Sequence, residues 1–313
     1  MILKSKVSLG LDIDSNKIKL VRINNNSSSN KWIIESIPNG LIARDRILSE
    51  ELLGQHIKEI IKLYKIREKR CALCVPTHYL TAKAFTLPKM SKEILMENIL
   101  YDIEEYLPLE LDNYIIDYKI MDVTTTNNIE YWNILVVAAL KEIIKSYIRV
   151  LKKAGLKPIY LDMPFNCMQK LLIKYSDNNK KRILKNGNLC LVDLGYYYND
   201  IIIVQKGKYF ANRIIANEEG KTELSQIRDE ILGIIRYFNN QVTTNNQLDR
   251  IIIFGEEEAS LKLMKLLKQD FKSDIYLWTE WINFRDLFSH DYQDNRIISL
   301  SKAIGSTIRR ISL

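Results

Sequence analysis

Two segments of the chain repeat one order of apolar and polar positions. Residues 7–21 read VSLGLDIDSNKIKLV, and residues 189–204 read LCLVDLGYYYNDIIIV. In each segment an apolar run ends at an Asp close to a Gly, a few turn residues follow, and a second apolar run begins. This order predicts a strand–turn–strand unit with an Asp at its tip. Its recurrence about 180 residues later indicates two related halves that face each other across a cleft.

The rest of the chain alternates between the periods of strands and helices. Strands are predicted at residues 7–13, 17–24, 31–37, 71–75, 82–87, 114–123, 131–140, 158–161, 189–194, 199–205, 208–215, 251–254 and 275–278, with turns at 24–30 and 124–130. Helices are predicted at residues 50–64, 91–106, 141–154, 164–175, 219–239, 257–268 and 299–311.

This order of elements favours an α/β fold in two lobes, because strands come in threes and are followed by helices and single strands. We expect the first lobe at residues 1–176 and the second at 187–313. The polar stretch 176–187 is the predicted boundary, with 180–182 in a loop.

Length and composition restrict the class of protein. The 313 residues are enough for two domains, and 47 % of them are apolar. No apolar run approaches the ~18–20 residues that cross a membrane. The first ten residues, MILKSKVSLG, lack the apolar segment of a signal peptide. The four cysteines fit a reducing compartment, so we expect a cytoplasmic protein.

Two features that suggest a ligand have plainer explanations. Cys71 and Cys74 form a CxxC inside a predicted strand, and no second CxxC or His pair completes a zinc site. The net charge of +8 admits an anionic partner such as nucleic acid or inner-leaflet lipid, or a general enrichment in Lys, Ile and Asn. The basic cluster at 180–182 has no interleaved aromatic residues, so we expect no nucleic-acid partner.

Four stretches, in this order, resemble one known family. They are LGLDIDSNKIKLV; the run from LPKMSKEILMENILYDIEEYLPLELDNYIIDYKIM to NILVVAALKEIIKSYIRVLKKAGLKPIYLDM; VDLGYYYNDIIIV; and SKAIGSTIRRI. They resemble the first phosphate hairpin, the inserted segment, the second phosphate hairpin and the C-terminal helix of the PilM family of type IV pilus assembly. The cytoplasmic domain of type II secretion platform proteins and the division protein FtsA are relatives of that family.

The resemblance implies an actin/Hsp70-like fold of two related halves, each a three-stranded meander followed by helices. It implies a small subdomain inserted at about 86–160 in the first half, and a terminal helix, 299–311, that returns to the first lobe. Only about 50 residues separate the second hairpin from the strand at 251–254, so we expect a reduced subdomain 2B in the second lobe.

The resemblance also implies a role and a partner. A PilM-like protein is a scaffold under the inner membrane that binds the N-terminal tail of a single-span, PilN-like membrane protein and contacts other platform and motor proteins. The tail would lie in a groove between the first lobe and the inserted subdomain. The candidate surface is the helix at 91–106 and its end at Tyr106, Leu107 and Pro108.

A PilM-like fold can hold ATP with Mg²⁺ between its hairpins. The residues that match such a site are Asp12, Ser15, Asn16, Lys19, Asp193, Gly195 and Gly255.

Other positions depart from the family pattern. Asp14 adds charge to the first turn, the second turn reads Tyr196-Tyr197-Tyr198, and the adenosine turn reads Gly255-Glu256-Glu257-Glu258. Bulky rings would crowd a phosphate, and unit charges ~4–8 Å apart interact by about 2–4 kcal/mol in a partly dehydrated cleft. We therefore predict a degenerate site with no cofactor and no catalytic residue.

Three alternatives follow from the same resemblance. The chain could be a weak ATP binder of the PilM type, with ATP–Mg as its cofactor. It could be a sugar-kinase-type enzyme, which would need an intact adenosine turn and a catalytic Asp. It could be an FtsA-like protein whose tail, AIGSTIRRISL, binds a membrane surface.

Overall fold

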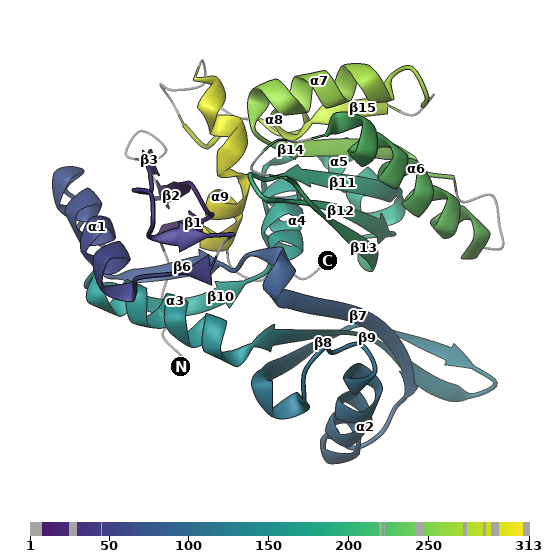
Figure 1. Ribbon diagram of the computed structural model, residues 1–313. Coiled ribbons are helices and arrows are strands. Elements are labelled where there is room, and N and C mark those ends of the chain that lie inside the picture. Colours follow the sequence, from purple (N-terminus) through teal and green to yellow (C-terminus); the bar gives the residue numbers. More distant parts are fainter. Residues whose placement is uncertain are drawn as a thin grey trace.

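The computed structural model describes residues 8–24, 30–44, 46–218, 221, 223–241, 247–271, 274–283, 286–288 and 294–308. Figure 1 shows two lobes side by side and a smaller body that projects from the first lobe. Each lobe is built on a five-stranded sheet, and the smaller body on a three-stranded sheet. The fold is a mixed α/β fold in which the two lobes repeat one strand order.

The first lobe contains the first of the two predicted hairpins. Its sheet has the order β10-β6-β1-β2-β3, with bounds Lys157–Asp162, Arg70–Cys74, Leu9–Ile13, Lys17–Arg22 and Lys31–Ser36. Alternate residues of β1 point to opposite faces. Leu9, Leu11 and Ile13 pack with the helices α1 (Glu50–Leu63) and α3 (Lys141–Lys153). The opposite face of β1, at Gly10 and Asp12, packs against α9 (Ser301–Thr307), the last described helix.

A short pair of strands, β4 (Ile42–Ala43) and β5 (Arg46–Ile47), precedes α1.

The second lobe repeats this arrangement. Its sheet has the order β13-β12-β11-β14-β15, with bounds Lys208–Ala216, Tyr198–Gln205, Asn188–Leu194, Arg250–Gly255 and Asp274–Leu277. The apolar runs of β11 and β14 are buried along their length, as expected of parallel strands covered on both faces. The helices of this lobe are α5 (Asn178–Asn186), α6 (Leu224–Gln241), α7 (Glu257–Leu267) and α8 (Trp278–Trp281).

Two further helices lie side by side between the sheets (Figure 1). They are α4 (Pro164–Tyr175) and α9 (Ser301–Thr307), which follows a 3₁₀ segment, Asn295–Leu300. Helix α9 packs on β1 and β6 of the first lobe. Helix α9 therefore lies at the junction of the lobes rather than on the outer surface.

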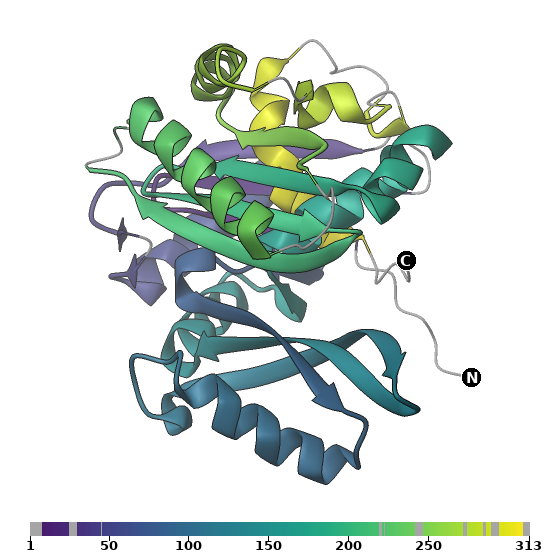
Figure 2. The ribbon, with the colours of Figure 1, turned by 90° about the vertical axis from the view of Figure 1, so that its right-hand side faces the viewer.

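The inserted body consists of β7 (Leu80–Pro88), α2 (Lys92–Glu104), β8 (Tyr114–Thr126) and β9 (Ile129–Leu140), with sheet order β7-β9-β8. Figure 2 shows this sheet between α2 and the lobes. The hydroxyl of Tyr209 in β13 donates to the carbonyl of Ala82 at 3.2 Å, and Lys208 pairs with Asp122. The insertion therefore contacts the second lobe as well as the first.

The hairpin of the insertion has a shorter turn than predicted. Only Asn127 and Asn128 lie outside its strands, and both have positive φ, 51° and 59°. Two left-handed residues form the type I′ turn that matches strand twist, and Asn tolerates this conformation. The threonines before it continue the strand instead of forming the turn.

The expected insertion, 86–160, is longer than the part that stands apart. Strand β10 pairs with β6 in the first-lobe sheet, and α3 packs on α1. The body that projects consists of residues 80–140, because the chain then returns to the first lobe.

The predicted loop at 180–182 was wrong, since these residues lie in α5. The Asp177 carboxylate accepts from the Lys180 backbone N–H at 2.8 Å and caps this helix, while Leu184 is buried on its inner face. The sequence marks this helix only by one capping residue and one buried apolar residue. Among so many polar residues, these two were too weak a signal to predict a helix.

The other predicted elements are confirmed within one to five residues at their ends. Helix α6 begins five residues later than predicted, and Glu219, the predicted start, lies outside the described residues. Most of the turn at 24–30 and residues 309–311 of the predicted terminal helix also lie outside them.

Candidate nucleotide cleft

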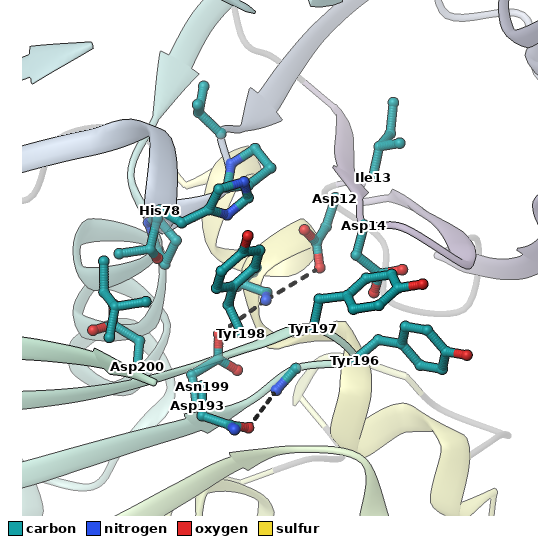
Figure 3. Close-up of a pocket in the computed structure, with 17 residues that line it drawn as sticks. Asp12, Ile13, Asp14, His78, Asp193, Tyr196, Tyr197, Tyr198, Asn199 and Asp200 are labelled. Carbon is teal, nitrogen blue, oxygen red and sulfur yellow. Dashed lines mark hydrogen bonds and ion pairs between the residues drawn. The ribbon is translucent and has the colours of Figure 1, made fainter. Parts of the chain in front are cut away.

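The two predicted hairpins meet across the cleft between the lobes. Asp12 lies near the end of β1, Asp193 near the end of β11, and Lys302 of α9 lies between them. The Lys302 Nζ atom is 2.9 Å from Oδ2 of Asp193 and 3.8 Å from Oδ2 of Asp12. Figure 3 shows Asp12 and Asp193 on opposite sides of the cleft, with dashed lines for these contacts. A lysine from the end of the chain thus joins the tips of both lobes.

Close packing of α9 places Lys302 at this depth. A Cβ atom on Gly10 would lie 2.1 Å from the carbonyl oxygen of Ala303. A Cβ atom on Gly305 would lie 2.1 Å from the carbonyl oxygen of Cys167 in α4. Both glycines let backbones approach closer than any side chain would allow. They fix the position of α9 against β1 and α4, and hence the position of Lys302.

The cluster of charges in the cleft is almost closed to solvent. The side chains of Asp12 and Asp193 are 5 % and 6 % exposed, and that of Lys302 is 14 % exposed. Burial by itself would lower the pKa of Lys302, but the carboxylates of Asp12 and Asp193 outweigh it and raise that pKa well above its ordinary value. The ammonium therefore stays charged at neutral pH.

The hydrogen-bond donors of the first hairpin turn bind a carboxylate of the same turn, that of Asp14. Oδ1 of Asp14 accepts from the backbone N–H groups of Asn16 at 3.1 Å and Lys17 at 2.8 Å. Oδ2 accepts from Lys19 Nζ at 2.8 Å, and Ser15 within the turn is buried. Backbone N–H groups of such a turn, together with a lysine, are the donors that a phosphate would need. In this chain Asp14 accepts from all three.

The second hairpin turn is held by asparagines. The backbone N–H of Gly195 donates to Oδ1 of Asn199 at 3.2 Å. Nδ2 of Asn199 donates to Oδ1 of Asn217 at 2.6 Å, and Nδ2 of Asn217 donates to the carbonyl oxygens of Gly195 and Tyr196 at 3.0 and 3.1 Å. A Cβ atom on Gly195 would lie 2.4 Å from the Tyr198 carbonyl oxygen. This turn is tight, and its Gly195 N–H is already paired.

Aromatic rings line the space between the turns, as the sequence predicted. The Tyr198 ring stacks on His78 of the first lobe, with centroids 4.0 Å apart and planes 15° apart, and Tyr197 meets Tyr196 edge-on at 4.8 Å. The cavity that remains has a volume of about 40 Å³. That is room for roughly three water molecules, whereas small-molecule sites have volumes on the order of 300–1,000 Å³.

The adenosine turn differs from its prediction. Gly255 has a φ of 111°, which a side chain would oppose. The carboxylates after it are not all free, because Glu256 pairs with Lys17 of the first lobe at 2.8 Å and Glu258 pairs with Lys262 at 2.6 Å. Two of the three predicted repulsive charges are thus partly neutralised, and Glu256 forms a second ion pair between the lobes.

The structure brings together six of the seven predicted site residues around this cluster: Asp12, Ser15, Asn16, Lys19, Asp193 and Gly195. The seventh, Gly255, pairs with Leu194, the residue before Gly195, where β14 lies beside β11. In this arrangement the donors of the first turn are held by Asp14, the Gly195 N–H is held by Asn199, and the Asp12 and Asp193 carboxylates pair with Lys302. The described residues contain no group of three or more His, Cys, Asp or Glu side chains placed to hold a metal.

Sequence reasoning missed three residues of the cleft. Lys302 lies in the terminal helix, which the sequence indicated only as a helix that packs on the first lobe. His78 lies in a short 3₁₀ turn, Thr77–Tyr79. Asp200 follows the tyrosines in β12, where burial raises its pKa to about 7 although Asn212 donates to it at 3.0 Å. In the sequence, only the position of Asp200 next to the second hairpin indicated that it could lie in the cleft.

The predicted partner surface is partly accessible. Tyr106 is 44 % exposed, and Lys83 Nζ lies 4.1 Å from the centroid of its ring. Pro108 is exposed beside it, whereas Leu107 packs into the core of the insertion. Tyr106 and Pro108 are therefore available to a partner, and Leu107 supports the fold.

A second apolar surface was not predicted from the sequence. Strand β10 is the edge of the first-lobe sheet, on the side from which the insertion projects (Figure 1). Tyr160 and Leu161 on this strand are 43 % and 39 % exposed. An edge strand leaves a row of unpaired backbone groups, to which another strand can bind.

Comparison with known proteins assigns the family. The family model described as type IV pilus assembly protein PilM matches residues 10–226, which is more than half of the chain. A solved PilM–PilN type IV pilus biogenesis complex contains a chain of the same fold, with 17 % identity and a TM-score of 0.79 over 97 % of this chain and 99 % of that one. A Bacteroides thetaiotaomicron protein with an actin-like ATPase fold has 13 % identity and a TM-score of 0.53 over 89 % and 93 %. The ethanolamine utilization protein EutJ of Carboxydothermus hydrogenoformans has 12 % identity and a TM-score of 0.50 over 98 % and 90 %. The chain has an actin-like fold and belongs to the PilM family of type IV pilus assembly proteins.

Proposed function

We propose that this protein is a scaffold that binds the extended N-terminal tail of a PilN-like membrane protein. Membership of the PilM family supports the setting, type IV pilus assembly. The similar chain in the PilM–PilN complex supports the partner class, since that protein assembles with PilN. Contacts with other platform and motor proteins belong to the same proposal.

The apolar edge strand β10, which has no further strand beside it among the described residues, is the observation that carries this proposal. An extended peptide adds to an exposed strand edge through its backbone, and neighbouring apolar side chains give it specificity. Tyr160 and Leu161 supply such side chains, and Ile115 of the insertion is also exposed. Tyr106 and Pro108, on either side of the packed Leu107, are the second candidate surface for the same tail.

Location at the inner face of the cell membrane follows from the partner. None of the helices in the described residues is long and apolar enough to cross a bilayer. A tail that belongs to a membrane-spanning partner would hold the protein at the membrane. An FtsA-like anchor is less well supported, because the described part of the terminal helix is mostly buried between the lobes.

We further propose that the nucleotide cleft is degenerate and that the protein is not an ATPase. The support is the small cavity, the tyrosines that line it, and the pairing of turn donors with Asp14 and Asn199. A kinase-type reaction has even less support, because a cavity of this volume holds neither nucleotide nor sugar.

A peptide-binding experiment tests the scaffold proposal. The probe is a labelled synthetic peptide with the N-terminal cytoplasmic sequence of the PilN-like protein encoded beside this one. Fluorescence anisotropy is expected to give a Kd of about 1–10 μM, that is, roughly −7 to −8 kcal/mol. We expect Leu161→Glu to weaken binding at least tenfold. Leu63→Glu is the matched control, because Leu63 is 70 % exposed on α1, outside either candidate surface.

The two candidate surfaces are separated by the same assay. Loss of binding in Tyr106→Ala with no change in Leu161→Glu would move the site to the end of α2. If neither the peptide nor the full-length partner binds the parent protein, the scaffold proposal is wrong.

A further inference from the structure

Two charged side chains lie where the ligand groups of an actin-like cleft would lie. Lys302 contributes a cation between the carboxylates of Asp12 and Asp193. Asp14 contributes an anion to the donors of the first hairpin turn. A metal would bind those two carboxylates, and a phosphate would accept from those donors. The cleft is therefore filled by charges of the signs that a metal and a phosphate carry.

Lys302 is the described partner of a carboxylate that is otherwise isolated. Oδ2 of Asp193 pairs with Lys302, and Oδ1 of Asp193 is buried without a hydrogen-bond partner in the described residues. Asp12 has a second cation, Lys19, at 3.5 Å. Removing the ammonium would leave Asp193 buried and unpaired, facing Asp12 from the other lobe. A buried charge that loses its partner is strongly destabilising.

We propose that Lys302 is an internal cation that holds the two lobes together in place of a bound metal ion, with Asp14 as the internal anion of the adjoining turn. The relation between the lobes is then set by the chain itself and needs no ligand. This inference concerns how the cleft is closed and holds whether or not the partner tail binds β10.

Variants that remove or keep the charge of Lys302 while nearly keeping its size distinguish an electrostatic role from simple packing. Lys302→Met keeps the length and apolar stem of the side chain and removes only the ammonium. Lys302→Arg keeps the positive charge. Lys262→Met is the control, because Lys262 is exposed and pairs with Glu258 within one helix turn.

Thermal unfolding provides the first measurement. We expect Lys302→Met to lower Tm by roughly 5–15 °C, Lys302→Arg to lower it less, and Lys262→Met to leave it within about 2 °C. The double variant Lys302→Met/Asp193→Asn removes both charges and is expected to melt above the single variant. This second variant keeps the test decisive if the single variant folds poorly.

Metal binding provides the second measurement. Without the ammonium, Asp193 has no cation partner in the described part of the chain and faces Asp12, whose remaining cation is Lys19 at 3.5 Å. Two such carboxylates bind hard divalent cations. We expect Lys302→Met to bind Mn²⁺ at millimolar concentration, seen as loss of the free Mn²⁺ electron paramagnetic resonance signal, and to gain several degrees in Tm. The parent protein and the double variant are expected to show neither effect.

Two results would overturn the proposal. One is a Lys302→Met protein that melts with the parent. The other is a double variant no more stable than the single variant, since the loss would then come from packing and not from charge. Neither result bears on the scaffold role, which the tail peptide tests separately.

Discussion

A Cβ atom on Gly10 would lie 2.1 Å from the carbonyl oxygen of Ala303, so β1 and α9 are in contact through their backbones. This contact sets the depth of α9, from which Lys302 reaches both hairpin tips. The same glycine lies in the first hairpin pattern, LGLDIDSNKIKLV, two residues before Asp12. In the structure, the absence of a side chain at Gly10 lets α9 pack directly against β1.

Gly10→Ala is therefore expected to destabilise the protein. The added methyl group would meet the backbone oxygen of Ala303, which cannot move aside as a flexible side chain can, at a cost of about 2–3 kcal/mol or more. Urea unfolding measures this difference. The matched control is Gly233→Ala in α6, where the nearest atom is 3.6 Å away and belongs to a flexible arginine. That change should be neutral or should stabilise the helix by up to about 1 kcal/mol.

Asn199→Ala is expected to loosen the turn of the three tyrosines. Asn199 is fully buried and joins the Gly195 N–H to Asn217, so its loss leaves buried polar groups unpaired. We expect a loss of about 1–3 kcal/mol in unfolding free energy. Hydrogen exchange should become faster in the turn at 195–198. Unchanged exchange there would mean that this network does not hold the turn.

Asp200 is expected to make stability depend on pH. Its folded pKa is raised to about 7 by burial, against about 3.9 in the unfolded chain. Between these values the folded state binds more protons, so this group's contribution to stability falls as pH rises from about 4 to about 7 and then stays constant.

The variant Asp200→Asn isolates this effect. It keeps an oxygen that can accept from Asn212 and removes the titration. It should be more stable than the parent at pH 8, by up to about 4 kcal/mol, with the advantage shrinking toward pH 4. Parallel urea titrations at several pH values measure it, and a constant difference across this range would contradict the assignment.

ATP with Mg²⁺ is expected not to bind the parent protein. The donors of both turns are paired, and the cavity of about 40 Å³ is too small for a nucleotide. Isothermal titration calorimetry should show no heat of binding at millimolar ATP–Mg. Clear binding that Asp12→Ala abolishes would show that the cleft opens and that the nucleotide site is functional.

Local pattern was enough to predict most of the elements. The hairpins at Asp12 and Asp193, the helices α1 to α4 and most of the strands follow from periodicity, caps and turn residues. The exceptions have local reasons as well. Asn127 and Asn128 form a two-residue turn where a longer one was expected, and α5 has a single buried Leu to mark it as a helix.

The chemistry of the cleft depended on contacts between distant segments. The sequence alone identified the carboxylates, the tyrosines and the glycines of a nucleotide-type cleft, because each lies in a recognisable turn. It did not show that Asp14 accepts from its own turn, that Asn199 of β12 pairs with Asn217 just after β13, or that β10 is the edge of the described first-lobe sheet. Above all it did not place Lys302, whose position depends on how deeply α9 packs against Gly10 and α4. Periodicity records which face of an element is buried, whereas the partner of a buried charge is decided by the tertiary packing that brings the elements together.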